Sequence, residues 1–283
     1  MPRFSYVNGA FVPHDIAMVH IEDRGYQFSD GVYEVISYKD NKLVDWTEHS
    51  VRLVNSLDGL KIPHPVSMRA LELLANELFR RNFMKNGCIY IQITRGVAPR
   101  NHQFPEYTNP SLVMTVSRPA LPSKKKYEKG VSVITCVDNR WGRPDYKTIS
   151  LLPNIMAKQN SVEHSCEEAI FINEDGFVTE GSATNFFIID KEGVLRTHPA
   201  DEHILGGITR SMVIKAAKDN KITVKEEPFT LKDVFNASGA FITSTTKNIL
   251  PVTVVDGKTI GNGDVSQLTE KLMKLHLDMI NAQ

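Results

Sequence analysis

Lys147 is the residue whose setting most directly points to covalent chemistry. It follows a polar, proline-containing run, Gly142 to Asp145, and precedes an apolar run from Thr148 to Pro153. Partial burial beside apolar neighbours disfavours an ammonium ion, and a neutral amine is what a lysine needs to form a Schiff base with a carbonyl compound. The alternative is an ordinary loop lysine, whose stem covers apolar surface while its ammonium group stays in water.

Two other groups of residues are suited to binding anions. Arg100 and His102 stand two positions apart in an expected loop, and because neither follows an apolar pattern, both are suited to gripping a carboxylate. Gly206 and Gly207 directly precede a helical pattern, and backbone N–H groups at a helix start favour a phosphate. Taken alone, each pattern is also typical of a solvated loop or a simple turn.

The elements that must position these residues form two domains. Residues 1–118 alternate short strand patterns with turn signals and two helical periods, which predicts an N-terminal α+β domain. Residues 119–126 break both periods with prolines and lysines and are expected to be a linker. Residues 127–283 predict a second α+β domain, which would carry Lys147. The expected helices are residues 48–58, 67–83, 154–163, 209–218 and 266–280.

The composition is that of an ordinary globular protein. The 283 residues are 41% apolar and 23% charged, and 33 basic residues balance 33 acidic ones, so neither a nucleic acid nor a membrane surface is expected as a partner. Three cysteines without CxxC spacing and nine histidines without helical ligand spacing indicate neither a disulfide framework nor a metal site. Since no signal-like or membrane-length apolar run is present, we expect a soluble cytoplasmic protein.

Eight segments, taken in their order along the chain, form a set of motifs. They are Glu22 to Val35, Gln92 to Glu106, Lys147 with its neighbours, Ala157 to Gln159, Thr179 to Phe187, Thr197 to Ala200, Gly207 to Arg210 and Thr243 to Thr246. Together they resemble the fold-type IV pyridoxal-phosphate enzymes, and within that family the transaminases of D-amino acids. The resemblance spans nearly the whole chain. It implies a two-domain α+β fold with a barrel-like C-terminal domain, pyridoxal 5'-phosphate in the interdomain cleft, and a homodimer whose subunits share loop residues.

The resemblance also implies roles for single residues. Lys147 would hold the cofactor and move a proton at the substrate Cα. Glu180 would face the pyridine nitrogen and keep it protonated. Tyr33 would bind the substrate α-carboxylate together with Arg100 and His102. The residues expected at the cofactor phosphate are Arg52, Ile208, Thr209 and Thr245.

The implied function is ping-pong transamination, in which a D-amino acid such as D-alanine gives its amino group and 2-oxoglutarate or pyruvate accepts it. The alternatives are a branched-chain L-amino-acid or (R)-amine transaminase, an aminodeoxychorismate lyase on the same fold, and a non-catalytic carrier of the cofactor. The loop with Arg100 and His102 disfavours the other two transaminases. Ser182-Ala183-Thr184 departs from the serine run of the D-amino-acid enzymes, which affects the expected rate and substrate range more than the reaction class.

Overall fold

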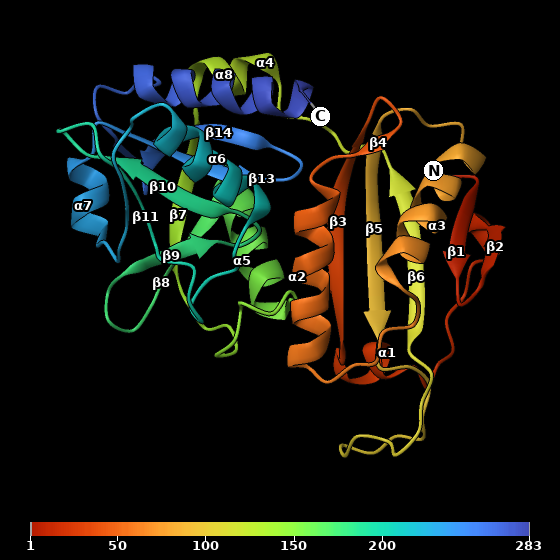
Figure 1. Ribbon diagram of the computed structural model, residues 1–283. Helices are drawn as coiled ribbons and strands as arrows, with labels where there is room; N and C mark the ends of the chain where they lie inside the picture. The colour runs from red at the N-terminus through yellow and green to blue at the C-terminus, as the bar shows by residue number, and fades with distance from the viewer. Residues whose placement is uncertain (1, 283) are drawn as a thin grey trace. The chain divides into compact units, whose positions relative to one another are not determined.

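The structure is a computed structural model that describes residues 2–282, which divide into two compact units (Figure 1). The first unit contains the chain up to Ala120 and the segment Tyr146–Ser150, and the second contains the rest. Lys147 therefore belongs to the first unit and not, as expected, to the C-terminal domain. The expected linker, residues 119–126, contains the first residues of a helix, α4 (Lys124–Lys129).

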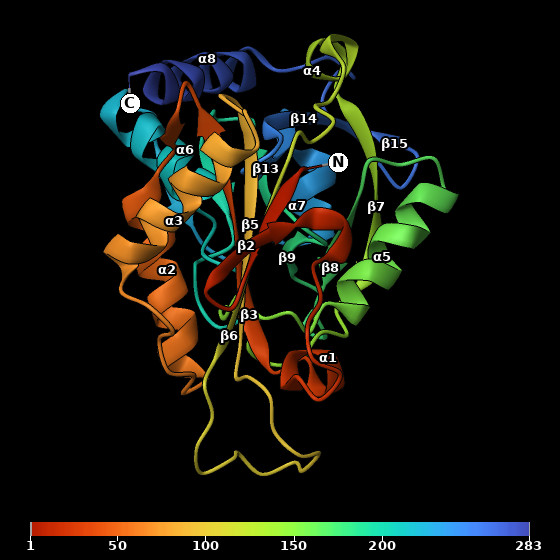
Figure 2. The same ribbon diagram turned by 90° about the vertical axis from the view of Figure 1, so that its right-hand side faces the viewer.

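The first unit is built on a six-stranded sheet in the order β2-β1-β6-β5-β3-β4, in which every neighbouring pair is antiparallel. The loop that joins β5 to β6 extends well beyond the end of the sheet (Figures 1 and 2). The elements are β1 (Phe4–Val7), β2 (Ala10–Pro13), η1 (His14–Ile16), α1 (Arg24–Phe28), β3 (Gly31–Lys39), β4 (Lys42–Leu43), α2 (Trp46–Gly59), α3 (Met68–Arg81), β5 (Gly87–Thr94) and β6 (Ser111–Ser117).

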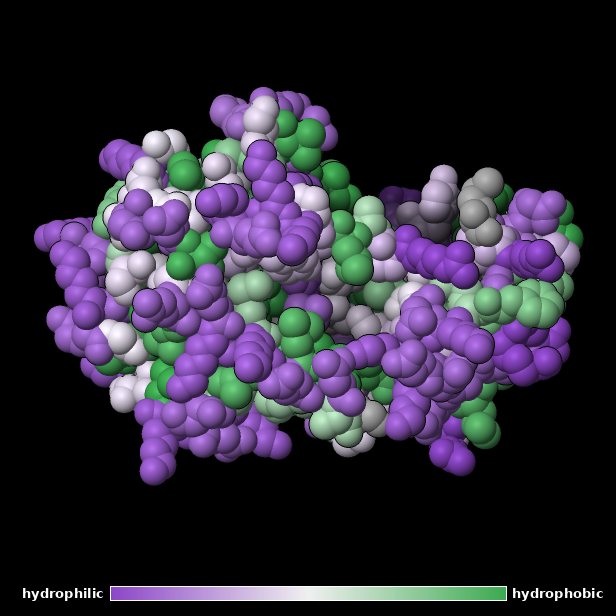
Figure 3. All heavy atoms as spheres, turned by 90° about the horizontal axis from the view of Figure 1, so that it is seen from above, coloured by the Kyte–Doolittle hydropathy of each residue, from purple (hydrophilic) through white to green (hydrophobic). Residues whose placement is uncertain are grey.

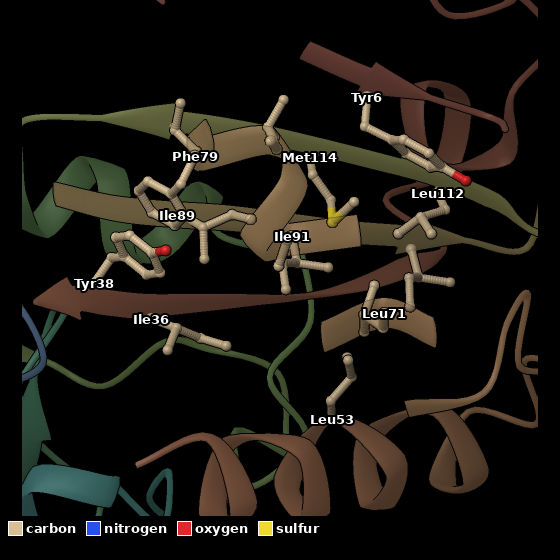
Figure 4. Close-up of a cluster of buried hydrophobic side chains, with 14 of the residues drawn as sticks. Tyr6, Ile36, Tyr38, Leu53, Leu71, Phe79, Ile89, Ile91, Leu112 and Met114 are labelled. Carbon is tan, nitrogen blue, oxygen red and sulfur yellow. The ribbon is translucent and has the colours of Figure 1, made fainter. Parts of the chain in front are cut away.

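Helices α2 and α3 contribute to the core of this unit on one face of the sheet. Ile36 and Tyr38 of β3 are buried there with Leu53 of α2 and Phe79 of α3 (Figure 4). The Tyr38 ring stacks on the Phe79 ring with centroids 3.7 Å apart. Because side chains alternate along a strand, Glu34 shares this helix-covered face, whereas its neighbour Tyr33 points to the opposite face.

The second unit contains a mixed nine-stranded sheet. Its order is β12-β11-β10-β13-β14-β7-β8-β9, with β15 beside β14, and β7 is parallel to both β14 and β8. Besides α4, its elements are β7 (Val131–Val137), α5 (Leu152–Glu163), β8 (Glu168–Ile172), β9 (Val178–Gly181), β10 (Asn185–Ile189), β11 (Leu195–Thr197), α6 (Ile208–Asp219), β12 (Val224–Glu226), α7 (Leu231–Asn236), β13 (Gly239–Ser244), β14 (Asn248–Val255), β15 (Lys258–Thr259) and α8 (Gln267–Asn281).

Strands β8, β10 and β13 of this sheet are buried on both faces, so they show no alternation of polar and apolar residues. In β10, Phe186 belongs to one apolar core and its neighbour Phe187 to another. Phe187 stacks on Phe241 with ring centroids 4.8 Å apart, in the core to which α6 and α8 contribute Val213 and Leu272. Four of the expected cofactor residues lie in this unit: Glu180, Ile208, Thr209 and Thr245.

Within residues 2–282, no helix combines the length and the apolar character that crossing a membrane requires. Seen from above, most of the visible surface is hydrophilic, with apolar side chains scattered between polar ones (Figure 3). The same described range contains no group of three histidine, cysteine or acidic residues arranged to hold a metal ion.

Candidate active site

Lys147 lies on the short segment that runs beside the start of β3. The Tyr33 N–H donates to the Lys147 carbonyl oxygen at 2.9 Å, and the Lys147 N–H donates to Ser56 Oγ of α2 at 3.1 Å. The lysine Nζ is 4.3 Å from the centroid of the Tyr33 ring, whose face attracts an ammonium ion. The structure thus brings together two of the expected residues, Lys147 and Tyr33, and leaves the lysine half-buried.

Arg52 is held on the other face of β3 by a buried carboxylate. Its Nε and Nη2 donate to the two oxygens of Glu34 at 2.7 and 2.8 Å, and His49 Nδ1 lies 2.8 Å from one of the same oxygens. Burial raises the pKa of Glu34, but the charge and hydrogen bonds of Arg52, with the contact to His49, outweigh burial and lower that pKa to about 2. The expected phosphate arginine is therefore held by a carboxylate that is ionised at neutral pH.

Glu180 lies at the end of β9 in the second unit, where it is buried. Arg140 Nη1 donates to its Oε1 at 2.5 Å, and Asn185 Nδ2 donates to its Oε2 at 2.9 Å. The Leu205 N–H adds a third bond at 3.1 Å. These donors, one of them cationic, favour the ionised carboxylate.

Arg140 links Glu180 to a second carboxylate, that of Asp138. Nε and Nη2 of Arg140 donate to the two Asp138 oxygens at 2.9 and 2.7 Å. Burial lowers the pKa of Arg140, but the two carboxylates outweigh burial and raise it above the usual range. Burial likewise raises the pKa of Asp138, while the bonds and charge of Arg140 lower it overall. Both shifts favour the charged forms of Asp138 and Arg140.

Ile208 and Thr209 open helix α6. The N-cap residue, Gly207, supplies no side-chain hydrogen bond, so the first N–H groups of the helix have no partner within it. A Cβ at Gly207 would collide with Asn185 Oδ1, and the same Asn185 holds Glu180. Glycine at this position therefore lets the helix start pack against the Glu180 site. Thr245 lies in the turn between β13 and β14.

The loop after β5 carries Arg100 and His102, and both are exposed. They gather around Phe28, since the Arg100 Cζ is 4.9 Å from the centroid of its ring and the His102 ring is 5.4 Å away. In the described part of one chain, no hydrogen bond or ring contact joins either residue to Tyr33. A cavity of about 560 Å³ in the same unit is lined partly by Tyr107 and contains none of the expected site residues.

Sequence reasoning missed three residues that hold Glu180 or its partner: Asp138, Arg140 and Asn185. Arg140 begins the segment that leads to Lys147, and Asn185 lies within the motif that contains Glu180. Their contacts with Glu180 span 40 and 5 positions. The one available signal was that Arg140 stands three residues after the strand pattern of residues 131–137 and seven residues before Lys147.

Comparison with known proteins decides the family. A profile described as amino-transferase class IV matches residues 31–255. The chain belongs to the class IV aminotransferases. Relatives of this class IV aminotransferase include the D-alanine aminotransferase of Staphylococcus epidermidis, 39% identical over 269 residues and 95% of each chain. That of Listeria monocytogenes serotype 4b is 42% identical over 276 residues, 97% of this chain and 95% of the relative.

The fold of this class IV aminotransferase is likewise shared with solved structures. The branched-chain amino acid aminotransferase of Escherichia coli superimposes with a TM-score of 0.92 at 23% identity, over 99% of this chain and 95% of that chain. The comparison confirms the predicted fold class, and family membership confirms the predicted cofactor, pyridoxal 5'-phosphate. The residues fit this cofactor, because an ionised Glu180 suits a protonated pyridine nitrogen and the uncapped start of α6 suits a phosphate.

Proposed function

We propose that this enzyme transfers the amino group of D-amino acids, D-alanine among them, to a 2-oxo acid such as 2-oxoglutarate or pyruvate. The observation that carries the proposal is that the Arg100 guanidinium is held by an aromatic ring while its N–H groups remain unused. Its guanidinium stacks on Phe28, and within residues 2–282 no protein acceptor takes its N–H groups. A stacked guanidinium with unused donors is suited to a substrate carboxylate. The names of the Staphylococcus and Listeria relatives support D-alanine as a donor.

The proposed roles fall on residues spread along the chain. Bound pyridoxal phosphate supplies a carbonyl group for the amine and a ring that withdraws electrons from the substrate Cα. Lys147 holds the cofactor through its amine and, when freed, moves a proton at the substrate Cα. Glu180 keeps the ring nitrogen protonated, and Tyr33, Arg100 and His102 bind the α-carboxylate. The residues proposed to bind the phosphate are Arg52, Ile208, Thr209 and Thr245.

Arg100 and His102 are proposed to act in the site of a second copy within a homodimer. This arrangement agrees with their exposure and with their lack of contact with Tyr33 in one chain. Large apolar side chains near the same loop are also exposed, with Ile21 and Tyr26 each 76% accessible, as suits a protein interface. The three cysteines are free, which agrees with an enzyme of the reducing cytoplasm.

The donor preference is tested by product chirality. With D-alanine and 2-oxoglutarate, chiral chromatography should show D-glutamate and an equal amount of pyruvate, whereas L-leucine should give little glutamate. Arg100→Ala should raise the KM for D-alanine by about 10- to 100-fold, as expected for one charge-assisted contact. The matched control is Arg118→Ala, an exposed arginine beyond the end of β6. Formation of L-glutamate from L-leucine at the higher rate would overturn the proposal.

The shared site is tested by mixing Lys147→Ala with Arg100→Ala and assaying at a D-alanine concentration well below the raised KM of Arg100→Ala, where both variants are nearly inactive. In a mixed dimer, a site shared between subunits combines the intact Lys147 of one subunit with the intact Arg100 of the other, so activity should rise after the subunits are exchanged. If both residues act within one chain, every site keeps one defect and the activity of the mixture does not rise.

A further inference from the structure

The loop that carries Arg100 and His102 runs from the end of β5 at Thr94 to the start of β6 at Ser111 and extends beyond the sheet (Figure 2). Because the sheet does not reach it, this substrate-binding loop needs a support from another element. Arg100 and His102 are exposed on the loop. Long side chains on such a loop sample many conformations, and fixing them on substrate binding costs affinity. Two features of helix α1 counter that cost.

The first feature is the ring of Phe28, the last residue of α1. The guanidinium of Arg100 lies 4.9 Å from the ring centroid, the His102 ring lies 5.4 Å away, and the guanidinium of Arg24 lies 4.8 Å away. An aromatic face attracts a cation above it. A guanidinium stacked in this way keeps the N–H groups at its edge available for a carboxylate.

The second feature is Arg24, which is almost fully buried. Its Nη1 donates to the carbonyl oxygens of Asn101 and Gln103 at 2.6 and 3.3 Å, and these two residues flank His102. Its Nε donates to Asp30 at 2.8 Å. Asp30 also accepts two hydrogen bonds from Arg95, at 2.7 and 2.9 Å. The loop backbone is thus tied through Arg24 to the acid that follows α1.

We propose that Phe28 is a positioning residue for the substrate carboxylate, which holds Arg100 and His102 in their binding orientation while Arg24 fixes the backbone between them. This inference rests on the proposed function, because the carboxylate contacts are part of it. Phe28 acts through Arg100 and His102. Its loss should therefore weaken the binding of amino acids and oxo acids and leave cofactor affinity unchanged.

Phe28→Leu is the first variant, with Phe28→Tyr as the conservative rescue. The KM for D-alanine should rise about tenfold in Phe28→Leu, with kcat changed less and cofactor affinity unchanged, and should return to near the wild-type value in Phe28→Tyr. Phe83→Leu is the matched control, since Phe83 also stacks on an arginine, Arg3 at 5.1 Å, but lies outside the loop. An unchanged KM in Phe28→Leu, or an equal loss of cofactor affinity, would overturn the inference.

A double-mutant cycle separates positioning from general packing. If Phe28 acts through Arg100, Phe28→Leu should add little further loss in an Arg100→Ala background; fully additive losses would contradict this.

Arg24→Lys keeps the charge beside Asp30 but loses the contacts with both carbonyl groups, so it should raise the KM for D-alanine. An unchanged KM would show that Arg24 does not help to position the loop. Failure of the wild-type enzyme to use D-alanine would instead refute the proposed function.

Discussion

Arg140 and Glu180 form a buried ion pair whose closest atoms, Nη1 and Oε1, are 2.5 Å apart. Arg140 also binds Asp138 at 2.7 Å, so one guanidinium neutralises much of the charge of two acids. Removing one member of such a buried pair leaves an uncompensated charge, which costs far more than the pair contributes. The pair therefore decides whether Glu180 remains a carboxylate.

Arg140→Met should destabilise the apoenzyme by about 3 to 5 kcal/mol and weaken its affinity for pyridoxal phosphate. Urea unfolding measures the first effect and absorbance titration the second. The matched control is Arg143→Met, whose pair with Asp145 is partly exposed and should contribute less than about 1 kcal/mol. Similar losses in the two variants would contradict the importance of the buried pair.

Lys147→Ala should abolish the absorbance of lysine-bound cofactor and lower turnover by at least about 10² to 10⁴. Lys158→Ala is the matched control, because the Lys158 ammonium is engaged with the Glu167 carbonyl oxygen. Absorbance spectra of the two purified variants decide between the lysines. If Lys147→Ala kept the band and Lys158→Ala lost it, the chemistry would have to be reassigned to Lys158.

Glu34 gives stability a defined pH dependence. Its pKa falls from an ordinary 4.5 to about 2 on folding, so its stabilising effect is complete above pH 4.5 and is lost as the pH falls towards 2. The shift corresponds to about 3 kcal/mol. Urea unfolding at pH 7, 4.5 and 3 should show that wild type loses more stability than Glu34→Gln over this range.

Glu77 provides the control for Glu34. Its pKa is also lowered to about 2, by hydrogen bonds from Arg80 and Arg81, but the group lies at the surface, where water screens the pairs. Glu77→Gln should therefore keep most of the wild-type pH dependence. An equal effect of the two substitutions would show that burial of Glu34 is unimportant.

Gly207→Ala should weaken cofactor binding by about 1 to 3 kcal/mol, because the added Cβ would push against Asn185 and so disturb the contact with Glu180. Gly206→Ala is an adjacent control, since a Cβ there meets no atom within 4 Å. Titration of each apoenzyme with pyridoxal phosphate measures the difference. Equal affinities would mean that Asn185 shifts without consequence.

The sequence predicted the long helices because each buries one apolar stripe. Residues 48–58, 67–83 and 266–280 were expected as helices, and α2, α3 and α8 match them closely. Short α1 was missed, since five residues show no helical period. The sequence around Lys147 did not show that this residue belongs to the first unit. Its place there depends on backbone pairing with Tyr33, which lies more than a hundred positions away, and such pairing leaves no local sequence pattern.

The central claim is tested most directly by a half-reaction without acceptor. The yellow holoenzyme is mixed separately with D-alanine, L-leucine and (R)-1-phenylethylamine, and loss of the absorbance of lysine-bound cofactor is followed by stopped flow. The account predicts fast bleaching by D-alanine alone, because Arg100 and His102 bind a carboxylate placed for the D-enantiomer. Faster bleaching by L-leucine or by the amine would contradict that role while leaving the aminotransferase fold, Lys147 and Glu180 in place.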